Sequence, residues 1–153
     1  MEVEADLDAT KCPAFAHIRK VNPRDLATDQ GDEVSTLSFQ MLRRGITWGT
    51  PYSEEEPHDA GDRGLLFMSY QVSIVDQFEE LTQRWMNQTG APEGLAGHDL
   101  LVGQAGDGPR TATIGPTPFT VPAAERWVTP TGGGYFFTPS TSALRRFAGD
   151  EYT

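Results

Sequence analysis

The sequence predicts an α+β fold in which antiparallel strands pack with helices, and three stretches indicate it. Residues 34–42 alternate in part between apolar and polar side chains, which is typical of a strand, here continuing toward Trp48. Residues 64–71 form a continuous apolar run bounded by turn residues, which predicts a strand buried on both faces. Between Ser73 and Asn87, apolar residues recur at helical spacing behind a serine N-cap. That segment is the clearest helix of the chain.

Proline, glycine and capping residues predict the remaining segments. Two prolines bracket residues 12–24, which leaves room for one or two helical turns or an ordered loop. Residues 51–63 contain three consecutive glutamates and are predicted to form a surface loop. Residues 103–126, rich in Gly, Pro and Thr, are expected to be a long irregular connection with one short strand. The last expected elements are closing strands at 127–129 and 134–138, and a helix capped by Ser140 or Ser142 that runs through Arg145 and Arg146.

Composition limits the class of protein. A length of 153 residues suits one domain, and a net charge of −10 argues against binding to nucleic acid or to an anionic membrane surface. No apolar run approaches the ~18 residues of a membrane span. The single cysteine, Cys12, excludes an intramolecular disulfide. The acidic N-terminus does not look like a signal peptide, so the expected location is the cytoplasm.

Two basic motifs carry the chemistry that the sequence suggests. His17 lies in a segment with few acidic residues, and the pair Arg43-Arg44 follows it. A neutral imidazole is a good axial ligand for haem iron, and a fixed guanidinium stabilises a negative charge that develops nearby. Each motif also has an ordinary reading: a histidine bonded to a backbone carbonyl, and an arginine pair on the surface.

Four segments resemble a known family: CP-x-x-AHIRK-x-NPRD from Cys12, LRRGI-x-WG from Leu42, GLLFM-x-YQ-x-SI-x-x-QFE from Gly64 and VTP-x-GGGYFF-x-PS-x-SALR from Val128. Together they resemble the C-terminal part of the dye-decolorizing (DyP-type) haem peroxidases. The resemblance implies a ferredoxin-like antiparallel sheet with helices, belonging to a dimeric α+β barrel that this chain completes only in part. It places an acidic tail at residues 1–11, the peroxidase-like domain at 12–148 and a second tail at 149–153.

On the proximal side, the resemblance implies that His17 ligates the iron of haem b. An axial histidine of a peroxidase usually donates its other ring proton to a carboxylate. Asp99 occupies the position equivalent to that carboxylate. A helix cap is the alternative role for Asp99, and Asp76 is the rival carboxylate, although it lies on the polar side of its helix.

On the distal side, the resemblance implies that Arg43 stabilises peroxide cleavage and that Leu65 and Phe67 wall the pocket. Leu65 and Phe67 alternate along one strand and therefore share a face. Ordinary core packing is compatible with that role. The family's GxxDG motif supplies a distal aspartate, and this sequence does not contain it. Residues 103–108 imitate the motif with the wrong spacing.

The other reactive side chains are weaker candidates. Trp48 and Trp85 are candidates for electron transfer from bulky dyes, although Trp85 lies on the apolar stripe of its helix, where core packing is favoured. Cys12-Pro13 occurs in haem-responsive sites, but a dipeptide has little specificity. His58 and His98 each precede an aspartate, yet no metal-binding spacing accompanies them.

The resemblance implies a haem peroxidase that oxidises dyes or phenolic compounds with hydrogen peroxide, weak or inactive as the isolated chain. The alternative is a truncated, non-catalytic remnant or interaction module that needs a partner chain with the GxxDG half. An incomplete sheet leaves edges and apolar surface exposed, and these recruit partners. A homo-oligomer and a separate N-terminal half are the partners expected.

Overall fold

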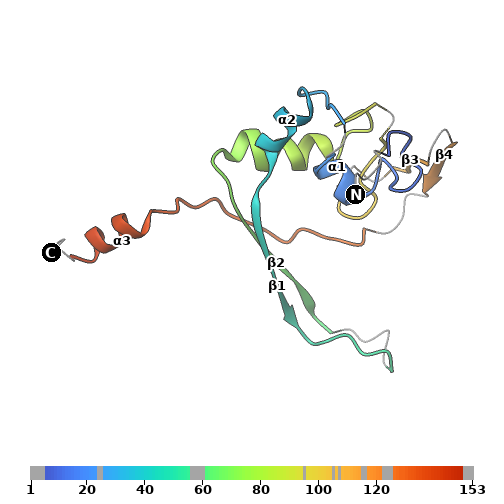
Figure 1. The fold of residues 1–153 in the computed structure, drawn as a ribbon. Helices are drawn as coiled ribbons and strands as arrows, with labels where there is room; N and C mark the ends of the chain where they lie inside the picture. Colours follow the sequence, from blue (N-terminus) through green and yellow to red (C-terminus); the bar gives the residue numbers. More distant parts are fainter. Residues whose placement is uncertain are drawn as a thin grey trace, which may run out of the picture.

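The computed structural model describes residues 6–23, 26–55, 61–94, 96–104, 106, 108–114, 117–121 and 126–149. Within them the fold is α+β, as predicted, with helices and two separate two-stranded antiparallel sheets (Figure 1). In chain order, the elements are α1 (His17–Val21), α2 (Glu33–Thr36), the 3₁₀ turn η1 (Leu37–Phe39), β1 (Leu42–Gly49), β2 (Arg63–Tyr70), the π-helix η2 (Ile74–Trp85), β3 (Arg110–Ile114), β4 (Thr117–Val121) and α3 (Thr141–Phe147).

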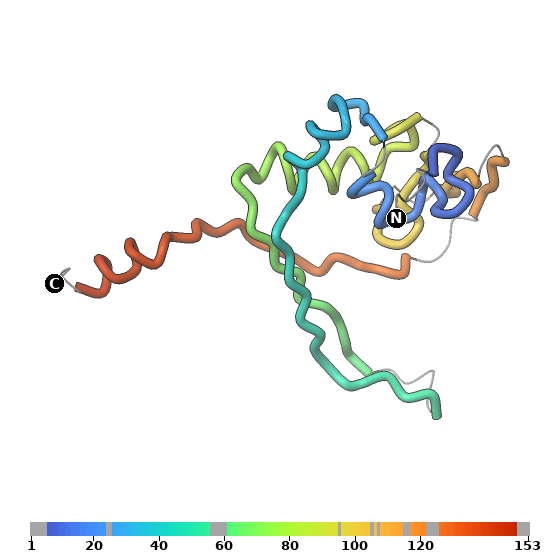
Figure 2. Tube along the Cα trace, viewed as in Figure 1, coloured from blue at the N-terminus to red at the C-terminus, as the bar shows by residue number. Residues whose placement is uncertain are grey.

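The chain divides into a body and two projecting arms. The helices α1, α2 and η2 and the β3–β4 pair make up the body, and the β1–β2 hairpin extends away from it (Figure 1). Residues 126–138 run back past the hairpin as an extended segment and lead to α3, which stands apart from the body (Figure 2). No helix of the described part of the chain has the length and apolar character that a membrane crossing needs.

The core lies between η2 and the segments that cross it. Leu81 and Trp85 are buried one turn apart, and Phe39 and Met41 pack against them. The Phe39 and Trp85 rings lie 4.8 Å apart between centroids. At the start of η2, the hydroxyl of Ser73 accepts a hydrogen bond from the Asp76 backbone N–H, which confirms the predicted N-cap. The predicted helix is therefore confirmed, but it ends two residues before Asn87.

The predicted strand at 34–42 is wrong over most of its length. Asp32 caps a helical turn instead, because its carboxylate accepts hydrogen bonds from the Ser35 backbone N–H at 2.8 Å and the Ser35 hydroxyl at 2.6 Å. This local cap competes with strand pairing and wins. The strand begins only at Leu42 and reaches Gly49.

The predicted apolar strand is present as β2, but its predicted burial on both faces is wrong. Leu65, Leu66 and Phe67 are each between 44% and 58% exposed. The cause is that β2 pairs with β1 alone within the described residues, and no helix backbone packs on the hairpin. A run of apolar residues indicates what a strand tends to bury. The described residues do not cover all of these side chains of β2.

The C-terminal expectations are confirmed in part. Two short strands, β3 and β4, replace the single strand expected within 103–126. The closing strands expected at 127–129 and 134–138 are absent, because these residues form no ladder with any strand of the described chain. The final helix is confirmed: the Ser140 hydroxyl accepts from the Ala143 backbone N–H at 3.2 Å.

Candidate functional site

A short polar contact joins the first residue of α1 to the loop after η2. His17 Nδ1 lies 2.6 Å from Asp99 Oδ2. The Asp99 side chain is fully buried, whereas the His17 side chain is 29% exposed. An ionised carboxylate only accepts hydrogen bonds, so His17 carries its proton on Nδ1. In the neutral imidazole, the lone pair of Nε2 then remains available.

Backbone contacts hold Asp99 in place. Its Oδ1 accepts from the backbone N–H groups of Leu101 and Val102 at 2.9 and 3.0 Å, and its own N–H donates to the Met86 carbonyl at 2.9 Å. Burial by itself would raise the pKa of Asp99, but the hydrogen bonds from His17, Val102 and Leu101 hold it below the usual value. Asp99 is thus an ionised acceptor that also caps its own turn.

The rival carboxylate has a different partner. Asp76 Oδ2 accepts from the Ser73 hydroxyl at 2.8 Å, at the exposed start of η2. The structure therefore brings Asp99 to His17, while Asp76 serves the cap of its helix. Gly103 permits the turn that presents Asp99, because a Cβ at Gly103 would lie 2.4 Å from the Asp99 carbonyl oxygen.

A buried lysine lies beside this pair and was not singled out from the sequence. Lys20 is 0% exposed, and its ammonium donates to the carbonyls of Gln88, Ala91 and Gly97 at 3.0, 2.6 and 2.5 Å. Burial lowers the pKa of Lys20 to about 8, while the Asp99 and Glu93 carboxylates act in the opposite direction. The sequence offers one signal: Lys20 lies three residues after His17 in the same short helix.

This pKa sets a pH dependence of stability with a definite sign. The unfolded chain keeps an ordinary lysine pKa near 10.5, so between pH 8 and 10.5 the unfolded state binds more protons than the folded state. The free energy of unfolding of wild type relative to Lys20→Met is therefore expected to rise with pH across this window, by at most about 3 kcal/mol. Urea unfolding of both proteins at pH 7 and pH 10 measures it. A difference that stays constant or shrinks contradicts the prediction.

The predicted distal residues share one face of the hairpin. Arg43 pairs with Ser69, Gly45 with Phe67 and Thr47 with Leu65. Directly opposed residues of an antiparallel pair point to the same side, so Arg43, Leu65 and Phe67 lie on one face. Gly45 leaves space that the Leu65 side chain covers, since a Cβ there would meet Leu65 Cδ1 at 3.0 Å. The Phe67 ring also approaches that of Phe78 on η2, at 6.4 Å.

Trp48 lies on the opposite face of the hairpin. It pairs with Gly64 and covers it, because a Cβ at Gly64 would lie 2.8 Å from Trp48 Nε1. Arg44, next to Arg43, also points to this second face. Trp48 is 49% exposed, whereas Trp85 is fully buried. The two candidate electron-transfer residues thus occupy very different surroundings.

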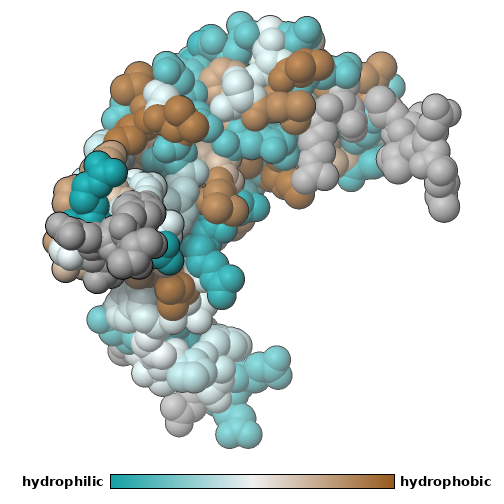
Figure 3. Space-filling model, turned by 60° about the vertical axis from the view of Figure 1, so that its left-hand side comes forward, coloured by the Kyte–Doolittle hydropathy of each residue, from teal (hydrophilic) through white to brown (hydrophobic). Residues whose placement is uncertain are grey.

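The structure does not bring the two halves of the candidate site into contact. Helix α1 packs against η2, and the backbone of the hairpin does not approach α1. Figure 3 shows the molecule as a crescent, with a hollow between the body and the outer end of the hairpin. His17 and Arg43 therefore belong to separate elements, α1 and β1, whose backbones do not approach each other.

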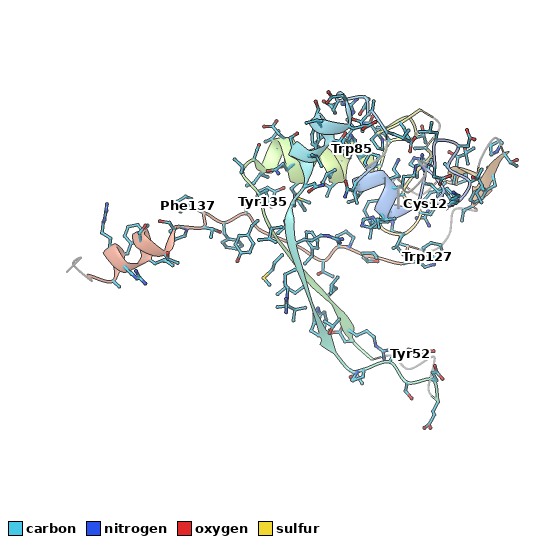
Figure 4. The ribbon with its side chains drawn as sticks, in the orientation of Figure 1. Cys12, Tyr52, Trp85, Trp127, Tyr135 and Phe137 are labelled. Atoms are coloured by element: carbon cyan, nitrogen blue, oxygen red, sulfur yellow. The ribbon has the colours of Figure 1, made fainter. Side chains whose placement is uncertain are left out.

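Other aromatic residues were missed by sequence reasoning. Trp127 lies under the guanidinium of Arg110, 5.5 Å from it. Tyr135 lies close to η2 (Figure 4), where its hydroxyl donates to Glu79 at 3.1 Å and its ring meets that of Phe78 edge to face. The GGGYFF motif contains Tyr135, but nothing in its spacing indicates a partner on the helix.

The weaker candidates remain without support as metal sites. In the described ranges, no three His, Cys, Asp or Glu side chains gather closely enough to hold a metal ion. Burial lowers the pKa of His98, together with the nearby charges of Lys20 and Arg110. His58 lies outside the described residues. Cys12 is half-buried, and its backbone N–H donates to Asp6 at 2.8 Å.

Comparisons with known proteins show the family of the chain. Residues 2–105 match the family model of the Dyp-type peroxidase C-terminal region. The chain is 34% identical to the multifunctional dye peroxidase DyP2 of Amycolatopsis sp., over 93% of this chain and 33% of that protein. It is 32% identical to the dye-decolorizing peroxidase msp1 of Mycetinis scorodonius, over 89% of this chain and 29% of that protein.

A solved structure has a similar fold. An ancestral D-type dye-decolorizing peroxidase superposes with a TM-score of 0.77 and 36% identity, over 92% of this chain and 33% of that one. The chain thus spans about a third of the length of these relatives. It belongs to the Dyp-type peroxidase family, of which it matches the C-terminal part.

Proposed function

We propose that this chain is the haem-binding C-terminal part of a DyP-type peroxidase that uses hydrogen peroxide to oxidise dyes or phenolic compounds. His17 is the proposed axial ligand of haem b. The observation that carries the proposal is the 2.6 Å bond from His17 Nδ1 to a fully buried Asp99. This bond fixes the ring tautomer and directs the Nε2 lone pair outward.

The arrangement of His17 and Asp99 fits the proximal side of a haem. Histidine is a common proximal ligand of haem proteins, and a carboxylate on its second nitrogen raises its basicity. His17 is partly exposed and Asp99 is not, so a cofactor can reach the ligand without reaching its partner. When bound, haem iron supplies the reaction with hydrogen peroxide. Asp99 would keep the proton at His17 Nδ1 and hold the ring in one orientation.

The exposed hairpin face would serve the distal side. Arg43 would supply a fixed positive charge and directed N–H donors beside developing negative charge on peroxide oxygen. Leu65 and Phe67, on the same face, would exclude water from the pocket. Trp48 and Trp85 are the proposed electron-transfer residues, with Trp48 nearer to solvent.

Arg43 gives the test of the distal assignment. In a protein reconstituted by co-expression with the N-terminal two-thirds of the Amycolatopsis relative, Arg43→Leu is expected to lower kcat/KM for hydrogen peroxide by about 10²–10³. Arg44→Leu is the matched control, because Arg44 points to the other face of the hairpin. It should leave kcat/KM within about twofold. Equal losses in both variants would contradict the assignment.

The surface of the chain supports a partner polypeptide. A compact monomer of this mass exposes about 7,700 Å², whereas this chain exposes 11386 Å². The excess of about 3,700 Å² on this chain alone is larger than the share that each partner buries in most permanent complexes. Within the described residues, β1 and β2 pair only with each other, so their outer edges are open to further strands. We propose that the family's N-terminal part covers this surface, extends the hairpin into a ferredoxin-like sheet of the α+β barrel and supplies the distal acid of the GxxDG motif.

The same surface favours a second candidate, a non-catalytic interaction module that associates with itself. Size-exclusion chromatography with light scattering separates the two candidates. A monodisperse dimer that does not exchange with the co-expressed N-terminal part favours the module. An aggregating chain that becomes a one-to-one complex with that part, and then binds haem, favours the peroxidase.

A further inference from the structure

The ammonium of Lys20 makes three hydrogen bonds, and none of them reaches a carboxylate. All three acceptors of its ammonium are backbone carbonyls, at 2.5 to 3.0 Å. An ammonium has three N–H donors, so the three carbonyls use all of them. The side chain is fully buried. It therefore holds the polypeptide backbone and has no donor left for a ligand.

The two segments that Lys20 joins are the two that carry the His17–Asp99 pair. Lys20 and His17 belong to α1, a helix of five residues whose N-cap makes no side-chain hydrogen bond. The three carbonyls belong to residues 88–97 of the loop that follows η2 and leads to Asp99. Gly97, which accepts the 2.5 Å bond, lies two residues before Asp99. Neither segment is itself a long helix or part of a sheet.

Other contacts also hold the loop, and one of them reaches α1. The backbone N–H groups of His98 and Asp99 donate to Thr111 and Met86, which tie the loop to β3 and to the end of η2. Arg19, also on α1, donates to Glu93 at 2.9 Å, at a partly exposed point of the loop. Lys20 is the buried tie between the helix and the loop.

We propose that Lys20 is a positioning residue whose ammonium sets the separation between His17 Nδ1 and Asp99 Oδ2 by binding α1 to the backbone of the 88–97 loop. A hydrogen bond of 2.6 Å tolerates little displacement, because its strength falls steeply with distance and angle. A clamp from a side chain of α1 to the backbone of the loop controls that geometry without touching the side chain of His17 or Asp99. Its consequence for haem affinity rests on the proposed function; the clamp itself does not.

The test is proton NMR of the haem-free chain, labelled with ¹⁵N-histidine, which reports the proton on His17 Nδ1. A hydrogen bond to a carboxylate moves that resonance far downfield, and His17→Ala and Asp99→Asn identify it. Lys20→Met, of similar length but without donors, is expected to shift the resonance upfield or to broaden it through exchange. Glu93→Ala, which removes the loop carboxylate that accepts from Arg19, should leave the resonance in place.

If Lys20 acted only by stabilising the fold, any variant of equally low stability would lose the resonance. Leu81→Ala destabilises the same core without touching the clamp. When urea brings its stability to that of Lys20→Met, Leu81→Ala should still retain the resonance. If Lys20→Met does not fold, Lys20→Arg keeps the charge but is longer and planar, so it displaces the loop and should also shift the signal. An unchanged resonance in either folded variant overturns the proposal.

A second measurement separates this inference from the proposed function. Hemin titration of the same variants should show a dissociation constant for Lys20→Met about ten times that of wild type, in the range for groups that orient a metal ligand. If hemin does not bind to wild type, the proposed function fails while the NMR result still decides the role of Lys20. If hemin binds and the resonance is unchanged in the Lys20 variants, the proposed clamp is wrong and the proposed haem site is retained.

Discussion

Replacing His17 with alanine is expected to remove specific hemin binding, raising the dissociation constant at least about 100-fold. The reason is that Nδ1 of His17 is bonded to a buried carboxylate, which leaves Nε2 as the nitrogen that can bind iron. Loss of this axial ligand leaves only apolar contact with the porphyrin. Even residues that merely orient a ligand are worth 10–100-fold in metal affinity. Titration of purified chain with hemin, followed by the Soret and charge-transfer bands, measures the change.

His98→Ala is the control for that titration. His98 is also partly buried and directly precedes Asp99, but the His17 ring, not the His98 ring, is bonded to the carboxylate. We expect one-to-one binding in wild type and in His98→Ala, and its loss in His17→Ala alone. Weak binding that is the same in all three proteins would mean that the proximal half-site does not form in this chain, and the proposed haem ligand would have to be abandoned.

The pairing of His17 with Asp99 was predictable because the family resemblance indicates both positions. His17 lies within an uninterrupted motif, and Asp99 follows the clearest helix of the chain at the position that the family resemblance indicates. The structure brings the two together, although they are 82 residues apart in sequence. The supporting lysine escaped prediction because its partners are backbone carbonyls, which leave no trace in the side-chain pattern.

The elements predicted wrongly were those whose state depends on a neighbour. The alternation at residues 34–42 suits a strand, yet the Asp32 cap makes a helical turn available within the same few residues. The segment at 134–138 has aromatic residues typical of a strand, but no strand lies beside it in the described chain. The exposed apolar residues of β2 follow the same logic. Sequence patterns predict what each element can bury, and the presence of a partner decides whether it does.

Trp85→Ala is expected to lower the free energy of unfolding by about 4 kcal/mol, the range for removal of a large buried aromatic side chain. Trp85 is fully buried, packs on Phe39 at 4.8 Å and anchors the core cluster with Leu81 and Ala91. The loss is larger than that expected for Trp48→Ala, because Trp48 is 49% exposed. Urea unfolding followed by circular dichroism compares the two variants.

Trp85→Phe sharpens this prediction, because the indole N–H of Trp85 has no hydrogen-bond partner among the described residues. An unpaired buried donor costs about 1–3 kcal/mol, so phenylalanine removes that cost while it leaves a small void. We expect a change of no more than about 1 kcal/mol in Trp85→Phe. A loss close to that of the alanine variant would mean that the N–H is paired in solution. In that case Trp85 would have a polar contact that could tune how easily its ring is oxidised in the proposed electron-transfer role.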